Sequence, residues 1–95
     1  MAGTRKRKQD YNENSEGSVC NYTMATTVRL AGVAAHRLRR YEEGGLITPA
    51  RTEGNQRLYS EADINLIKQI TLLEDEGINI EGIRAILEIR RGKRE

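Results

Sequence analysis

The chain has 95 residues, with 16 Lys and Arg against 14 Asp and Glu and a formal net charge of +2. This length allows one small domain, and because Phe and Trp are absent the core must come from Ile, Leu, Val and Ala. A single cysteine excludes an intramolecular disulfide, and with a single histidine we expect no metal site and no cofactor. No apolar run reaches membrane-spanning length and the first 20 residues lack a secretory apolar segment, so a soluble, cytoplasmic protein without membrane contact is expected.

The charge is unevenly distributed along the chain. Residues 21–60 hold six Arg against three Glu, a balance of +3, whereas residues 61–95 hold six basic and eight acidic groups, a balance of −2. A basic region of this kind is expected where a protein meets a polyanion.

We divide the chain into three parts. Residues 1–20 read as a disordered basic and polar tail, residues 21–90 as the folded domain and residues 91–95 as a basic C-terminal end. The basic run of residues 5–8 either touches DNA phosphates or serves only as part of a solvated tail.

The first helix is predicted over 24–31, with Thr23 as N-cap and Gly32 in the following turn. We expect Val28, Leu30 and Val33 to point inward. The hydroxyl groups of Thr26 and Thr27 either face a phosphate at the helix N-terminus or are ordinary surface groups.

The second helix is predicted over 35–43 and stops at Gly44-Gly45. Leu38 is its one large aliphatic side chain, and the rest of its surface carries His36, Arg37, Arg39 and Arg40. Such a helix is poorly suited to a core and well suited to a nucleic-acid groove.

A short hairpin is predicted next. Gly54-Asn55 separates residues 50–52 from residues 56–59 and fits a turn that needs positive φ. Arg51, Asn55 and Arg57 would lie along this projecting wing, where they could follow a DNA backbone.

Two more helices follow the hairpin. Ser60 and Asp63 form a capping box for a long helix that ends at Gly77, and Asn79 starts the last helix. The inward residues expected on the long helix are Ala62, Ile64, Ile67, Ile70, Leu72 and Leu73. Those expected on the last helix are Ile80, Ile83, Ile86 and Leu87. The acidic run of residues 74–76 would repel phosphate, so we expect it to point away from DNA.

Four motifs follow one another along the chain: LAGV, LRRYEEGGL, PARTEGNQRLYS and SEAD at the start of a helix. In this order they resemble the DNA-binding domain of the MerR family of bacterial transcription regulators. The resemblance covers 21–89, and its nearest branches are the nitrogen regulators and heat-shock repressors. It implies a mainly α, winged helix-turn-helix fold with a two-stranded wing and two following helices, acting as a homodimer on a pseudo-palindromic promoter site.

By family position, Arg37, Arg39 and Tyr41 lie on the recognition helix, and Arg57 and Tyr59 lie on the phosphate-contacting wing. The sequence departs from the family pattern at three places. Arg40 occupies a position where many members have Tyr, and Ala34-Ala35 replace a common Ser-Pro pair. Thr26 replaces the Glu of the family's first helix. The sequence pattern and the family resemblance together predict ten DNA-binding residues: Thr26, His36, Arg37, Arg39, Arg40, Tyr41, Arg51, Asn55, Arg57 and Tyr59.

The family's long dimerisation helix and effector domain have no counterpart in these 95 residues. Either the chain is an excised DNA-binding domain, or it is a short form that pairs through other surfaces such as its N-terminal segment. We expect a sequence-specific regulator of double-stranded promoter or operator DNA, with repression favoured by the branch resemblance. The alternatives are an excisionase-like architectural DNA-binding factor and a basic module for an acidic protein partner such as an RNA polymerase subunit. An enzyme is not expected, because His36 has no Ser, Cys or carboxylate at catalytic spacing.

Overall fold

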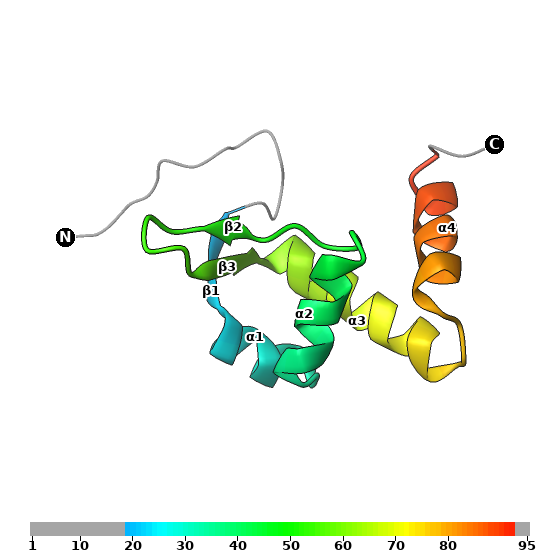
Figure 1. Ribbon diagram of the computed structural model, residues 1–95, viewed down its shortest axis with the longest axis horizontal. Coiled ribbons are helices and arrows are strands. Elements are labelled where there is room, and N and C mark those ends of the chain that lie inside the picture. Colours follow the sequence, from blue (N-terminus) through cyan, green and yellow to red (C-terminus); the bar gives the residue numbers. More distant parts are fainter. Residues whose placement is uncertain (1–18, 93–95) are drawn as a thin grey trace.

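The structure is a computed structural model and describes residues 19–92 (Figure 1). Of the predicted N-terminal tail (1–20) and basic C-terminal end (91–95), only residues 19–20 and 91–92 are among the described residues, so these predictions lie largely outside them. The elements, in chain order, are β1 (Cys20–Thr23), α1 (Met24–Ala31), α2 (Ala35–Glu43), β2 (Ala50–Arg51), β3 (Arg57–Ser60), α3 (Glu61–Asp75) and α4 (Ile80–Arg90). The predicted mainly α class is confirmed, and the bounds predicted for α1 and α2 agree with the structure.

The sheet contains one strand more than predicted. Its order is β1-β3-β2, all antiparallel, so β3 is the central strand and pairs with both the wing and the segment that precedes α1. Tyr59 of β3 lies opposite Tyr22 and is only 1% exposed. The hairpin turn is as predicted, since Asn55 has a φ of 69°. The base of the wing is thus part of the core, and only its tip projects.

Helix α1 packs through an i, i+3, i+4, i+7 stripe made by Met24, Thr27, Val28 and Ala31. The inward orientation predicted for Leu30 is wrong, because Leu30 falls beside this stripe and is 44% exposed. Thr27 occupies the core position and is fully buried, so it cannot present a hydroxyl to a phosphate. Gly32 ends the helix with a φ of 68° and donates its N–H to the carbonyl of Val28.

Helix α3 begins with the predicted capping box. The Asp63 amide donates to Ser60 Oγ over 3.0 Å, and the Ser60 amide donates to Asp63 Oδ2 over 2.9 Å. Ser60 is also the last residue of β3, so strand and helix join without a connecting residue.

The buried stripe of α3 is narrower than predicted. Ile64, Ile67 and Ile70 are at most 5% exposed, but Leu72 is 65% exposed and Ala62 is exposed as well. The stripe continues instead to Glu74, which lies seven residues after Ile67 and four after Ile70. The first carboxylate of the acidic run therefore turns inward, while the two that follow are exposed.

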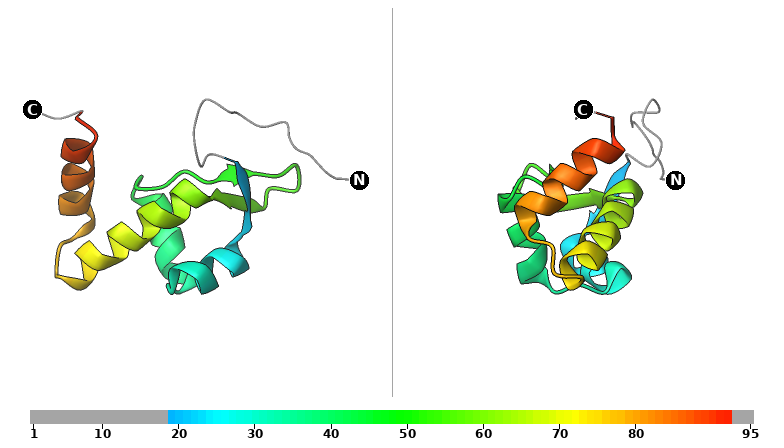
Figure 2. Two further views of the ribbon diagram at one scale, coloured as in Figure 1. Left: turned by 180° about the vertical axis from the view of Figure 1, so that it is seen from behind. Right: turned by 90° about the vertical axis from the view of Figure 1, so that its right-hand side faces the viewer.

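Helix α4 lies at the end of the molecule opposite the sheet, and α3 runs between them (Figure 2). Asn79 caps α4 by accepting the amide of Gly82 over 2.8 Å, and Ile83 and Leu87 are buried. Nη2 of Arg84 donates to the carbonyl of Gly44, which follows α2. A Cβ on Gly44 would lie 2.8 Å from Cγ2 of Ile80, so only glycine lets α4 come this close to the end of α2.

Candidate nucleic-acid interface

The outer face of α2 carries three basic or potentially basic side chains. His36, Arg39, Arg40 and Glu43 are all exposed, and their spacing of three or four residues places them on one side of the helix. Leu38 and Tyr41 lie on the opposite side and are 0% exposed. Within residues 19–92, the side chains of His36 and Arg39 make no hydrogen bond or ion pair. Both are therefore available to a ligand without breaking an internal contact.

Arg37 is oriented differently from its neighbours. Its Nε and Nη2 donate to Oε1 of Glu74 over 3.2 and 2.7 Å, and Nη2 also donates to Oδ1 of Asp75 over 3.1 Å. The hydrogen bond to Glu74 raises the pKa of Arg37 further above its already high usual value. Arg37 therefore fastens α2 to α3, and in this structure it is not directed at a base edge.

Glu74 receives two further donors from α2. The hydroxyl of Tyr41 donates to Oε1 over 2.7 Å, and Nη2 of Arg40 donates to Oε2. Burial alone would raise the pKa of Glu74, but the bonds from Tyr41 and Arg37, together with the charges of the two arginines, lower it overall. One carboxylate of α3 thus holds three side chains of α2.

Glu42 connects α2 to the wing in a similar way. Nε of Arg57 donates to Oε1 over 2.6 Å, and Nη2 of Arg51 donates to Oε2 over 2.8 Å. Burial would raise the pKa of Glu42, but these two hydrogen bonds and charges outweigh it and lower the pKa. Arg51 also donates from Nη1 to the carbonyl of Asn55 over 3.1 Å, which braces the wing tip.

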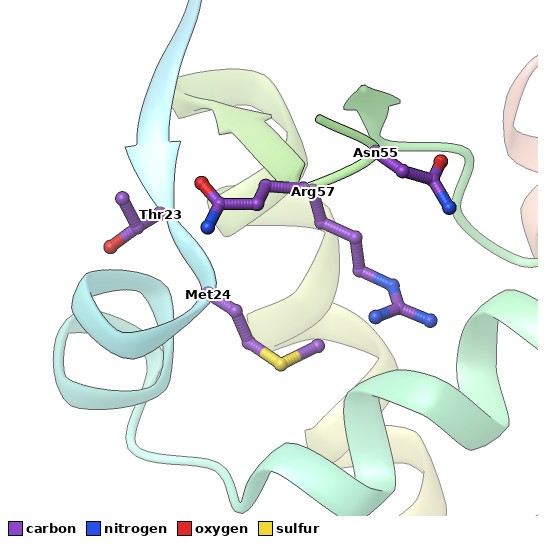
Figure 3. A pocket seen from close by; sticks show the side chains of 5 residues that line it. Thr23, Met24, Asn55 and Arg57 are labelled. Carbon is purple, nitrogen blue, oxygen red and sulfur yellow. The ribbon is translucent and has the colours of Figure 1, made fainter. Parts of the chain in front are cut away.

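Arg57 keeps part of its guanidinium free. Only Nε is bonded to Glu42, and neither terminal nitrogen makes a hydrogen bond within the described part of the chain. Figure 3 shows this guanidinium directed toward α2 above the Met24 side chain, at a hollow of about 360 Å³ between the start of α1 and the wing. Thr23, Met24, Asn55, Gln56 and Arg57 line the hollow.

The sequence matches the MerR HTH family of regulatory proteins over residues 22–89. The chain belongs to the MerR family. That family consists of helix-turn-helix regulatory proteins. Among the described residues of this MerR-family chain, no helix is long and apolar enough to cross a membrane.

Two curated MerR-family relatives illustrate the sequence similarity. The putative heat shock protein HspR of Streptomyces coelicolor is 38% identical over 90 residues, and the match covers 94% of this chain and 57% of HspR. The regulator GlnR of Bacillus cereus is 34% identical over 74 residues, covering 78% of this chain and 57% of GlnR. The chain therefore spans just over half the length of these relatives. HspR and GlnR represent the two branches, heat-shock repressors and nitrogen regulators, that the sequence resemblance indicated.

A solved MerR-family structure supports the same fold. HiNmlR, a regulator lacking the sensor domain and bound to promoter DNA, superposes with a TM-score of 0.68 at 26% identity. The superposition covers 73% of this chain and 53% of HiNmlR. The predicted winged helix-turn-helix architecture is confirmed by this similarity.

The structure separates the ten predicted MerR-type contact residues into three groups. His36, Arg39, Arg40, Arg51 and Asn55 are exposed, Thr26, Arg37 and Arg57 are half-buried, and Tyr41 and Tyr59 are buried. The two tyrosines belong to the hydrophobic core and therefore present no surface to DNA in this structure. The contacts that Glu42 and Glu74 make with these arginines were not predicted from the sequence, which marked Glu74 only as part of an acidic run expected to point away from DNA.

Proposed function

We propose that the chain binds a specific promoter sequence as a homodimer, with α2 in the major groove and the wing along the phosphate backbone. The observation that supports this most strongly is the outer face of α2, where His36 and Arg39 are exposed and free of internal partners. HiNmlR, which shares the fold, is bound to promoter DNA.

In this arrangement Arg39 and His36 read base edges, and Arg57 and Arg51 contact phosphates. Glu42 orients Arg57 through Nε and leaves its two terminal nitrogens for a phosphate oxygen. Contacts to phosphate supply affinity without sequence preference, whereas contacts to base edges supply discrimination. The two roles can therefore be separated by substitution.

The experiment begins with selection of binding sites from a library of genomic fragments. The selected duplex and a scrambled duplex are then titrated with native protein, Arg39→Gln, Arg57→Gln and Lys68→Gln. Lys68 is the matched control, because it is exposed on α3 and has no partner among the described residues. Arg39→Gln should reduce discrimination between the duplexes by about 1 to 3 kcal/mol, and Arg57→Gln should weaken both about equally.

If no sequence is enriched, or if Arg39→Gln behaves as Lys68→Gln does, the proposed assignment of α2 is wrong. Sedimentation with a two-half-site duplex tests the dimer, which should bind as two chains per duplex. We further propose repression, on the resemblance to the heat-shock and nitrogen branches. A reporter driven by the selected promoter should lose expression when the protein is present, and a gain would contradict repression.

A further inference from the structure

Two arginines of α2 are held by a carboxylate of the protein itself. Arg37 and Arg40 both donate to Glu74, each to a different oxygen. A carboxylate with two oxygens accepting from guanidinium groups presents the same chemistry as a phosphate oxygen pair. Glu74 therefore occupies donors that would otherwise be available to a DNA backbone.

The two arginines are not held equally strongly. The Arg37 side chain is 23% exposed and also reaches Asp75, whereas the Arg40 side chain is 44% exposed and has Glu74 as its one carboxylate partner within residues 19–92. Within that part of the chain, Arg40 therefore depends on Glu74 alone, whereas Arg37 would keep Asp75 if Glu74 were replaced. Arg40 is also on the outer face of α2, beside His36 and Arg39.

The position of Glu74 follows from the packing of α3. Glu74 continues the buried stripe after Ile67 and Ile70, so its carboxylate is directed at α2 with a side chain only 22% exposed. Asp75 and Glu76, which follow, are exposed, and Asp75 accepts only one bond from α2, from Nη2 of Arg37. The restraint on Arg40 thus depends on one residue.

We propose that Glu74 is a specificity-determining positioning residue, which limits sequence-independent DNA binding by holding Arg40, and with it Arg37, away from phosphates. The proposal rests on the part of the proposed function that places α2 against DNA. It adds that the internal carboxylate reduces the number of phosphate contacts the free domain offers to any duplex. Sequence preference then depends more on the base contacts made by the rest of the outer face of α2.

The test compares native protein with Glu74→Gln and Glu76→Gln on a duplex of random sequence. Both substitutions remove one negative charge near the end of α3, but Glu76 is exposed and has no side-chain partner among the described residues. Fluorescence anisotropy is recorded between about 50 and about 200 mM salt. Glu74→Gln should bind more tightly and steepen the slope of log K against log salt by about 0.9 per added phosphate contact. The ratio of its affinity to that of native protein should therefore fall about threefold between the lowest and the highest salt concentration.

A second set of variants identifies the arginine that is released. In the Arg40→Gln background, the change Glu74→Gln should no longer steepen the slope. Arg40→Gln alone should weaken random-duplex binding much less than Arg57→Gln, because Arg40 is already held in the native protein whereas the terminal nitrogens of Arg57 are free within residues 19–92. This single variant also tests the restraint if Glu74→Gln fails to fold, which a thermal unfolding curve would reveal.

The inference is overturned if Glu74→Gln matches Glu76→Gln, if its gain persists in the Arg40→Gln background, or if Arg40→Gln costs as much as Arg57→Gln. It is also overturned if native protein and Glu74→Gln both fail to bind random duplex at low salt. If Glu74→Gln shows the expected gain while no genomic sequence is enriched, the restraint stands and the proposed function fails. The two failures are thus distinguishable.

Discussion

Nε of Arg57 in the wing lies 2.6 Å from Oε1 of Glu42 in α2, so the two parts of the candidate interface are joined through one carboxylate. Arg51 donates to the other oxygen of the same group. The angle between wing and helix is therefore set by side chains as well as by the sheet.

Substitution Glu42→Gln should lower the free energy of unfolding by about 1 kcal/mol, because two partly buried charged hydrogen bonds are weakened. It should also make the wing tip more accessible to protease. Urea denaturation and limited proteolysis measure these effects. Glu43→Gln is the control, since Glu43 is exposed and makes no hydrogen bond or ion pair within residues 19–92. Equal effects of the two substitutions would contradict a specific role for Glu42.

Stability should depend on pH through Glu42 and Glu74. Both pKa values are lowered in the folded protein from an ordinary 4.5 by their arginine partners and, for Glu74, by Tyr41. A lowered native pKa contributes stability that is fully present above the unfolded pKa and is lost as pH falls through the native value. Urea midpoints should thus be steady above about pH 5.5 and fall below about pH 4.5. In Glu42→Gln and Glu74→Gln this fall should be shallower, and an unchanged profile would refute the linkage.

Thr27→Val should stabilise the domain. The Thr27 hydroxyl is fully buried and finds no hydrogen-bond partner within the described residues. Valine keeps the shape and removes the unpaired polar group, so a gain of about 1 kcal/mol and a Tm rise of several degrees are expected. Thr71→Val is the contrast, because the Thr71 hydroxyl donates to the carbonyl of Ile67 over 2.8 Å. If Thr71→Val stabilised the domain and Thr27→Val destabilised it, the expectation would be wrong.

Gly44→Ala should destabilise the contact between α2 and α4 by about 1 to 3 kcal/mol, because the added methyl group would overlap Cγ2 of Ile80. Ile80 is β-branched and has few rotamers with which to move aside. Gly54→Ala at the wing tip is the matched control, since its nearest atom would be Oγ1 of Thr52 at 3.8 Å. Thermal unfolding of both variants should separate them by several degrees. Similar Tm values would mean that α4 can shift without cost.

Local chemistry made the helix ends predictable from the sequence. Ser60, Asp63 and Asn79 have side chains that satisfy backbone groups a few residues away, and Gly32 and Gly77 adopt positive φ where the helices end. These interactions need no knowledge of the rest of the chain. The same holds for the wing turn at Asn55.

Long-range packing was less predictable. Strand β1 has too few residues to show an alternating pattern, and only its pairing with β3 makes it a strand. Leu30 and Leu72 are apolar yet exposed, whereas the polar Thr27 is buried, because helix geometry and neighbouring elements decide which positions face the core. The partners of Arg37 and Arg57 are 37 and 15 residues distant in the chain, so spacing could not reveal them.

The direct junction at Ser60 restricts where this chain can change its length. An inserted residue between Tyr59 and Ser60 would shift β3 by one position and turn Tyr59 out of the core, since successive strand residues face opposite sides. An insertion between Ser60 and Glu61 would instead break the three-residue spacing of the capping box at the start of α3. Insertions and deletions among relatives are therefore expected to gather at the exposed tip around residues 53–55, where the hairpin can lengthen without disturbing the register.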